Sequence, residues 1–323
     1  IPVPYSTHEG QPGELLAKYN LLKESNMRTE YIATNLYADY EDTFGDAHYF
    51  KGMVGYNYEQ STYKSTYVQR NGLLLDDSEN INLALGDAIT TSGGYNRWRV
   101  AGGFFRLNYA FKDRYLLEVN GRYDGSSKFP KNSRFGFFPS VSAGWRISEE
   151  AFMKPLNSVL SNLKLRGSWG NIGNQSITPY AYIPGMDAEQ AYWTVSGIKV
   201  TTLKPAALVS NSFTWEKVTT IDVGFDLGLL DNRLNMVFDW YRRDTKGMLA
   251  PGSELPGVLG ASAPLQNTAD LRSKGWEISV DWNDQIGKVK YSIGFNLYDA
   301  KTKITKYNNE TGLFGKDKND NET

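Results

Sequence analysis

Carboxylates are the side chains in this sequence best suited to chemistry. Five of them recur at alternating positions of neighbouring apolar segments: Asp222, Asp226, Asp239, Glu277 and Asp281. A glycosidase uses two carboxylates held at a defined separation on either side of the scissile bond. Here the carboxylates are spread along a repeating polar face, and nothing in the pattern marks one pair as a pocket. We therefore expect no catalytic residues and no enzyme activity.

Other reaction classes lack the residues that they need. The chain contains no Cys and only two His, His8 and His48, which disfavours thiolate nucleophiles, Cys-based metal sites and Ser-His-Asp triads. The segment DGSSKFPKNSR at 124–134 lacks the Gly-Lys-Ser/Thr order of a phosphate-binding loop. The run DKNDN at 317–321 has the spacing of calcium ligands but not the Gly that should follow. We expect no metal site and no cofactor.

Charge and hydropathy exclude two classes of partner or fold. Lys and Arg number 35 against 36 Asp and Glu, and a nucleic-acid-binding domain usually has a basic excess. No apolar run approaches the roughly 18 residues of a transmembrane helix. The mean hydropathy of -0.48 remains compatible with a membrane barrel, because only alternate residues of a barrel strand face lipid.

A two-residue periodicity runs through almost the whole chain and predicts about ten long strands. In the segment 216–230, Ile221, Val223 and Phe225 fall on one face, and Asp222 and Asp226 on the other. The same alternation occurs at 31–42, 47–60, 98–111, 115–124, 137–147, 162–170, 234–243, 276–282 and 289–297. Most of these segments are long enough to span a bilayer as tilted strands, since such a strand needs roughly 9–11 residues.

The predicted connections alternate between short and long. Short turns are expected at 43–47, 112–114, 230–233 and 284–288, and one or two small helices at 148–161. Long polar loops are expected at 61–97, 125–134, 171–214 and 246–271. This alternation is typical of an outer-membrane β-barrel with tight periplasmic turns and long extracellular loops. The fold class is therefore predicted to be all-β, a transmembrane antiparallel barrel.

The periodicity also predicts which side chains face lipid and which face the lumen. The lipid-facing set is represented by Phe225, Trp240, Ile278 and Phe295. The lumen-facing set comprises Arg166, Asp222, Asp226, Asp239, Arg243, Glu277 and Asp281. Aromatic residues near the turns fit the girdles that flank a bilayer.

Several long motifs in series resemble the SusC/RagA family of TonB-dependent outer-membrane transporters. They are RYLLEVNGRYDGSSKF, FGFFPSVSAGWRISEEAFM, LSNLKLRGSWGNIGNQ, FTWEKVTTIDVGFDLGLLDNRLNMVFDWYRRDTKGML and NTADLRSKGWEISVDW. The resemblance implies a large barrel, usually of about 22 strands, around an N-terminal plug domain. It also implies TonB-driven uptake of glycans or peptides, and a SusD-like surface lipoprotein as a lid. Residues 1–323 are then expected to form part of one barrel domain, without the plug domain or the closing C-terminal strands.

Two groups of residues have both a functional and a structural interpretation. The lumen-facing acids either line the substrate path and contact plug arginines, or pair with Arg166, Arg243 or Lys164 across strands; we favour the pairing. Exposed aromatics stack on sugars and anchor interfaces. The loop 171–214 carries such candidates for substrate or lid contact in Tyr180, Tyr182, Tyr192 and Trp193. Alternatively, they pack the loop against its own strands.

Two rival functions remain open at this stage. The chain is either part of an outer-membrane importer or a small self-contained outer-membrane barrel acting as an adhesin or enzyme. A soluble β-rich binding module is disfavoured by the rows of outward Trp and Phe. The expected location is the outer membrane of a Gram-negative bacterium.

Overall fold

The computed structural model describes residues 21–73, 80–86, 89–210, 214–252 and 255–307. Ten strands form one sheet in the order β1-β2-β3-β4-β5-β6-β9-β10-β11-β12. From β3 to β12, each strand pairs antiparallel with its neighbour in the sheet. The candidate calcium run and His8 lie outside the described residues.

The first strands of the sheet are β1 (Leu21–Phe44), β2 (His48–Asn71), β3 (Ile89–Phe111), β4 (Tyr115–Ser126) and β5 (Phe135–Arg146). The sheet continues through β6 (Leu160–Asn174), β9 (Glu216–Leu229), β10 (Leu234–Pro251), β11 (Leu265–Ile286) and β12 (Val289–Lys306). A separate hairpin consists of β7 (Ala188–Val195) and β8 (Ile198–Leu203). Short 3-10 helices are η1 (Ile81–Leu83), η2 (Lys131–Ser133), η3 (Ile147–Glu149), η4 (Ala151–Leu156) and η5 (Gly257–Leu259). Among the described helices, none has the length and apolar character needed to cross a membrane.

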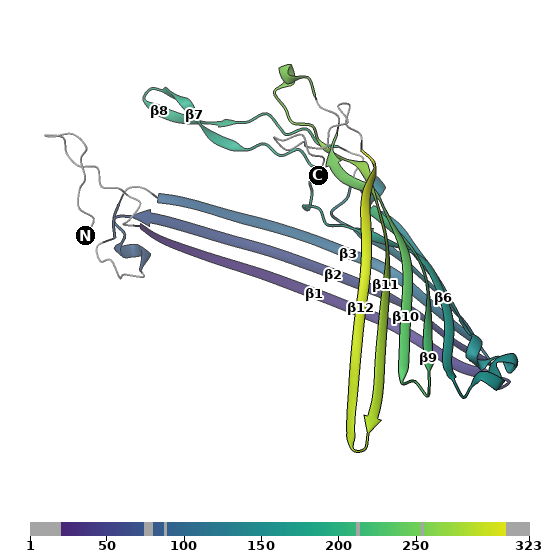
Figure 1. The fold of residues 1–323 in the computed structure, drawn as a ribbon. Coiled ribbons are helices and arrows are strands. Elements are labelled where there is room, and N and C mark those ends of the chain that lie inside the picture. The colour runs from purple at the N-terminus through teal and green to yellow at the C-terminus, as the bar shows by residue number, and fades with distance from the viewer. Residues whose placement is uncertain (1–20, 74–79, 87–88, 211–213, 253–254, 308–323) are drawn as a thin grey trace, which may run out of the picture. The chain divides into compact units, whose positions relative to one another are not determined.

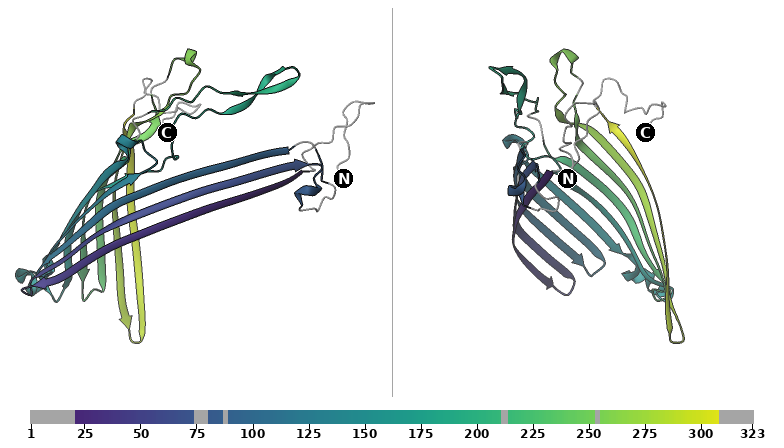
Figure 2. Two further views of the ribbon diagram at one scale, coloured as in Figure 1. Left: turned by 180° about the vertical axis from the view of Figure 1, so that it is seen from behind. Right: turned by 90° about the vertical axis from the view of Figure 1, so that its left-hand side faces the viewer.

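The chain divides into two compact units. The first holds residues up to 33 and 59–99, and in it an isolated bridge joins Leu73 to Ala84 beside η1. The second holds 34–58 and everything from 100 onward. In the second unit, β4, β5, β6 and β9 to β12 lie side by side, with the tight turns at one end and the longer connections at the other (Figure 1, Figure 2).

The alternation of short and long connections confirms the predicted fold class. Tight turns occupy 45–47, 112–114, 230–233 and 287–288. Three of them place successive residues at positive φ, namely Gly45 and Asp46, Lys112 and Asp113, and Leu230 to Asn232. This backbone matches the right-handed twist of the flanking strands. The predicted small helices after β5 are present as η3 and η4.

The predicted loops were too long, because the strands continue into them. The loop between β2 and β3 covers only 72–88, and that between β10 and β11 only 252–264. In β2 the alternating Tyr63, Ser65 and Tyr67 keep the strand pattern where polar content suggested a loop. Sequence analysis also missed the β7–β8 hairpin inside the loop between β6 and β9.

At the tight-turn end, the carboxylate of Glu150, between η3 and η4, accepts hydrogen bonds from three side chains. Tyr115 Oη donates to Glu150 Oε1 at 2.6 Å, and Trp145 Nε1 donates to the same oxygen at 3.1 Å. Arg114 Nη1 donates to Glu150 Oε2 at 3.3 Å. The hydrogen bonds from Tyr115 and Trp145, with the charge of Arg114, lower the pKa of this carboxyl. Glu150 therefore ties the η3–η4 link to the ends of β4 and β5.

We expect the Glu150→Gln variant to unfold at a lower temperature than the wild type at neutral pH. The neutral amide is a weaker acceptor for Tyr115 and Trp145 and loses the ion pair with Arg114. Because the folded-state pKa is lowered, the stabilisation is complete above the ordinary carboxyl pKa of about 4.3 and is lost as the pH falls through the folded value. Heat-modifiability on gels between pH 7 and 3 measures this difference.

The matched control is Glu149→Gln, because Glu149 is exposed on η3. We expect its unfolding temperature to follow the wild type at every pH. Identical pH profiles for the Glu149 and Glu150 variants would contradict the assigned role of Glu150.

Candidate functional site

Strand register separates the side chains of the sheet into two faces. Phe225 lies opposite Phe238, which lies opposite Ile278. Directly opposite residues of antiparallel strands point to the same side. Trp240 is two positions from Phe238, and Phe295 is two positions from Leu297, the partner of Ile278. The four predicted lipid-facing residues thus share one face, on which Phe295 is 59 % exposed; their contact with lipid stays a prediction.

The opposite face carries all the predicted lumen residues. Arg166 lies opposite Gly224, and Gly224 opposite Asp239, which lies opposite Glu277. The same face carries every residue that is an even number of positions from Gly224, Asp239 or Glu277 on its own strand. These residues are Asp222, Asp226, Arg243 and Asp281. The sheet therefore has a largely apolar face and a polar face rich in charges and small residues.

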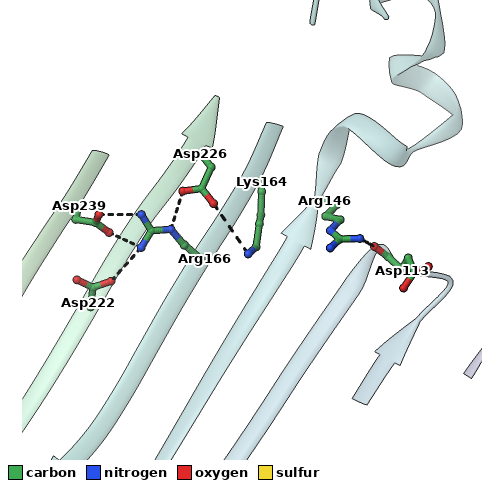
Figure 3. A network of polar contacts seen from close by, with 7 residues as sticks. All are labelled: Asp113, Arg146, Lys164, Arg166, Asp222, Asp226 and Asp239. Atoms are coloured by element: carbon green, nitrogen blue, oxygen red, sulfur yellow. Dashed lines mark hydrogen bonds and ion pairs between the residues drawn. The ribbon is translucent and has the colours of Figure 1, made fainter. Parts of the chain in front are cut away.

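An ion-pair network centred on Arg166 spans three strands of the polar face (Figure 3). Arg166 on β6 donates from Nε to Asp226 Oδ1 at 2.9 Å and from Nη2 to Asp239 Oδ2 at 2.8 Å. Its Nη1 lies 3.9 Å from Asp222 Oδ1. Lys164 Nζ lies 4.0 Å from Asp226 Oδ2. Arg166 therefore holds three carboxylates that would otherwise repel one another.

The remaining predicted lumen residues lie beside or beyond this network. A depression of about 450 Å³ is lined by Arg166, Asp222, Asp239, Arg243 and Glu277, among others. Arg243 has no ion pair among the described residues, so the expected pairing of the acids with Arg243 is not seen. Asp281 lies apart, with its carboxylate over Gly294 of β12. The polar face thus keeps some unpaired charge beside the Arg166 network.

We expect Arg166→Met to destabilise the complete receptor by roughly 2–4 kcal/mol, because three partly buried carboxylates lose their shared cation. Urea unfolding of the receptor in detergent measures the change. Arg243→Met is the control, since this cation is exposed on the same face. Equal losses in both variants would show that the network does not carry the effect.

A small aromatic core lies at the loop end of the polar face. Phe129, Phe138 and Trp215 are 1 %, 7 % and 4 % exposed, and they come from the β4–β5 loop, β5 and the segment before β9. The Trp215 ring centroid lies 5.0 Å from that of Phe129 in a tilted arrangement and 5.3 Å from that of Phe138 in an edge-on arrangement. A Cβ at Gly173 would clash with the Phe138 ring, so the glycine makes room for this packing. The core joins segments that are far apart in the sequence.

Hydrogen bonds link the β4–β5 loop and the β6–β9 loop to each other and to β10 and β11 beside this core. Asn267 accepts from Thr214 N at 3.1 Å and donates to Gly247 O. Trp215 Nε1 donates to Arg134 O at 2.9 Å. Lys128 Nζ donates to Gln175 O at 3.2 Å, and burial lowers the pKa of Lys128. The bases of the loops are therefore fixed in place.

The four candidate loop aromatics separate into two pairs. Tyr180 and Tyr182 have ring centroids 6.3 Å apart, and Tyr182 packs against the aromatic core. Tyr192 and Trp193 lie on β7 and are 94 % and 60 % exposed. The packing interpretation thus describes Tyr182, whereas Tyr192 and Trp193 are open to a partner.

Sequence analysis missed an apolar groove formed by two loops. A depression of about 560 Å³ is lined by parts of 204–209 and 259–265, including Leu208 and Leu259. Val258 beside it is 95 % exposed. The groove could have been predicted from the apolar residues inside two Pro- and Gly-rich runs, KPAALV and PGVLGASAPL. Exposed apolar loop residues mark interaction surfaces.

The fold and the two faces define a segment of an outer-membrane β-barrel. The model of the TonB dependent receptor-like β-barrel family matches residues 5–321. The chain therefore belongs to the TonB-dependent receptor β-barrel family, as the motifs predicted.

Two relatives and one solved structure support this placement. The chain is 30% identical over 280 residues to TonB-dependent receptor P3 of Formosa agariphila, covering 86% of this chain and 28% of the relative. It is 33% identical over 279 residues to TonB-dependent receptor SusC of Bacteroides thetaiotaomicron, covering 85% and 27%. The predicted SusC/RagA resemblance is thereby confirmed. The chain thus spans little more than a quarter of the length of these relatives.

Similarity of fold extends to a solved complex. The RagAB peptide importer in its open-open state matches with a TM-score of 0.79 at 22% identity, covering 90% of this chain and 31% of that chain. The match supports the arrangement of strands in the sheet.

We expect Phe225→Arg to lower the amount and heat stability of the receptor in outer membranes. A cation on the lipid face costs roughly 2–4 kcal/mol at the bilayer midplane. Quantitative blotting of membranes and heat-modifiability measure the effect. Phe225→Leu and Ser168→Arg are controls that should assemble normally, because Ser168 lies on the opposite face directly across from Asp222. Normal assembly of the Phe225→Arg variant would contradict the lipid-facing assignment.

Proposed function

We propose that this chain is the strand-bearing part of a TonB-dependent outer-membrane importer of glycans or peptides. The observation that carries the proposal is the family match over residues 5–321, together with 33% identity to SusC. In this proposal the chain performs no covalent chemistry. Its roles are to span the membrane, surround the transport path and position extracellular loops.

The polar face supports an interior role. Arg166 neutralises the acids in part, while Arg243 and Glu277 line the adjoining depression. A hydrated surface with ion pairs and open charges suits contact with a plug domain elsewhere in the receptor and with a passing substrate. The TonB complex would then act through that plug domain.

The loop end supports a role in capture. The aromatic core fixes the loop bases, while Tyr192, Trp193 and the groove beside Leu208 and Leu259 stay open. Rigid aromatic anchors beside apolar surface are typical of interface hot spots. We assign these residues to contact with a SusD-like lid lipoprotein or with the substrate.

The length of the relatives favours import over the small self-contained barrel. P3 and SusC each match this chain over less than a third of their own length, so the matching proteins are large receptors. No feature of the described residues favours an adhesin or an enzyme.

The test of import uses cells carrying the complete receptor, deprived of other uptake routes. A mixture of oligosaccharides of varied composition and linkage and a defined peptide mixture serve as probes. We expect uptake of one probe class that stops when a protonophore collapses the proton-motive force. The proposal would be refuted if uptake continued in the presence of the protonophore. It would also be refuted if cells lacking the receptor took up both probe classes as well as cells that carry it.

We expect Tyr192→Ala/Trp193→Ala to weaken binding of the lid lipoprotein or of the imported probe by about tenfold or more, as loss of hot-spot aromatics does. Calorimetry with the purified receptor measures both affinities. Ile198→Ala/Lys199→Ala on the facing strand β8 is the control. Unchanged affinity for both ligands would show that the hairpin aromatics contact neither.

A further inference from the structure

Cations gather in two rows on the apolar face of β10, β11 and β12. Register places Arg242 opposite Lys274, and Lys274 opposite Lys301. In the next row toward the loops, Asp244 lies opposite Arg272, and Arg272 opposite Lys303. We call these six residues the cationic patch. It joins five cations with a single carboxylate.

The patch is not neutralised within the described part of the chain. Asp244 serves both arginines, with Arg242 Nη2 2.8 Å from its Oδ2 and Arg272 Nε bound to its Oδ1. Lys274, Lys301 and Lys303 have no ion pair among the described residues. Like charges directly opposite each other destabilise a sheet. Asp299 lies in the adjoining row of β12, so five cations stand beside two carboxylates, Asp244 and Asp299. The excess of positive charge favours binding of an anion from outside these strands.

The patch lies directly beyond a pair of tryptophans. Trp240 and Trp276 lie opposite each other in the row next to Arg242 and Lys274. Toward the tight turns, the same face continues with Ile278, Leu297 and Phe295. Tryptophans favour the boundary between hydrocarbon and water, and long lysine side chains extend from it toward the headgroups.

A depression in the surface lies between the tryptophan pair and the cationic patch. Its volume is about 480 Å³, and its lining includes Trp240, Trp276, Arg272, Lys274, Lys301 and Lys303. One carboxylate, Asp299, also lines it, directly opposite Trp276 on β12. A ligand with an anionic head and an apolar body fits this order of residues along the strands.

We propose that the cationic patch binds the phosphorylated headgroup of an outer-leaflet lipid. Phosphate oxygens accept charge-assisted hydrogen bonds from Lys and Arg, and the acyl chains would lie along Ile278, Phe295 and Leu297. The loop end of the strands faces the cell exterior in this family, which places the patch in the outer leaflet. The proposal goes beyond import and rests on the lipid-facing assignment of this face.

The test compares two double variants of the complete receptor. Lys301→Gln/Lys303→Gln removes two patch cations, and Lys288→Gln/Lys290→Gln removes two lysines at the tight-turn end of the same hairpin. The probes are monophosphoryl lipid A and its dephosphorylated form in mixed micelles, with bound lipid counted by native mass spectrometry.

We expect the patch variant to bind the phosphorylated lipid at least tenfold more weakly, because each basic residue near an anionic surface contributes about fivefold. The control variant should bind as the wild type does, and both variants should keep the wild-type unfolding temperature.

Three results would overturn the proposal. They are equal binding by the two double variants, equal binding of the phosphorylated and dephosphorylated lipids, and displacement of the lipid by millimolar inorganic phosphate. The face assignment is checked separately with Ile278→Cys, carrying a fluorophore, and nitroxide-labelled acyl chains as quencher. Lack of quenching overturns the lipid-facing assignment itself, whereas quenching with unchanged lipid binding overturns only the headgroup site.

Discussion

Every structural feature of this sheet depends on an uninterrupted backbone register. Inside hydrocarbon, an unpaired backbone N–H or C=O has no water to bind, so a spanning strand must pair along its whole length. From Leu234 to Thr245, β10 keeps an unbroken ladder with β11, and the irregularities of this pair lie beyond Thr245 toward the loop. Once the register is fixed, the parity of a residue decides its face. A slip by one position would put Asp222 and Asp239 on the apolar face and Phe225 among the charges.

The Arg166 network is a consequence of that register. Arg166 on β6 lies opposite Gly224 on β9, which lies opposite Asp239 on β10. Because Gly224 has no side chain, the guanidinium reaches across β9 to Asp239, and a Cβ at Gly224 would crowd both groups. One cation thereby links three strands. The glycines of the polar face thus do more than reduce bulk, since one of them lets a charge be shared between non-adjacent strands.

Sequence alternation predicted the ten strands of the sheet and the face of each candidate strand residue, because both follow from a period of two, but it ended β2 and β10 too early and missed the β7–β8 hairpin. It could not choose partners for charges. Arg243 was as plausible a partner as Arg166, and only the register and the gap at Gly224 decide for Arg166. Nor could it find the core of Phe129, Phe138 and Trp215. These residues come from three separated segments, and contacts of that kind leave no local pattern.

The two faces of the sheet differ in their balance of charges, and the difference bears on what the apolar face binds. On the polar face, acids outnumber cations, yet Arg166 and Lys164 lie within reach of Asp222, Asp226 and Asp239. On the apolar face, cations outnumber acids, and Asp244 is shared by two arginines while three lysines stand opposite other cations. On the polar face a shared cation thus offsets part of the acidic charge within the sheet, whereas the cations beside Trp240 and Trp276 exceed the acids beside them on these strands, and the proposed headgroup would supply the missing counter-charge.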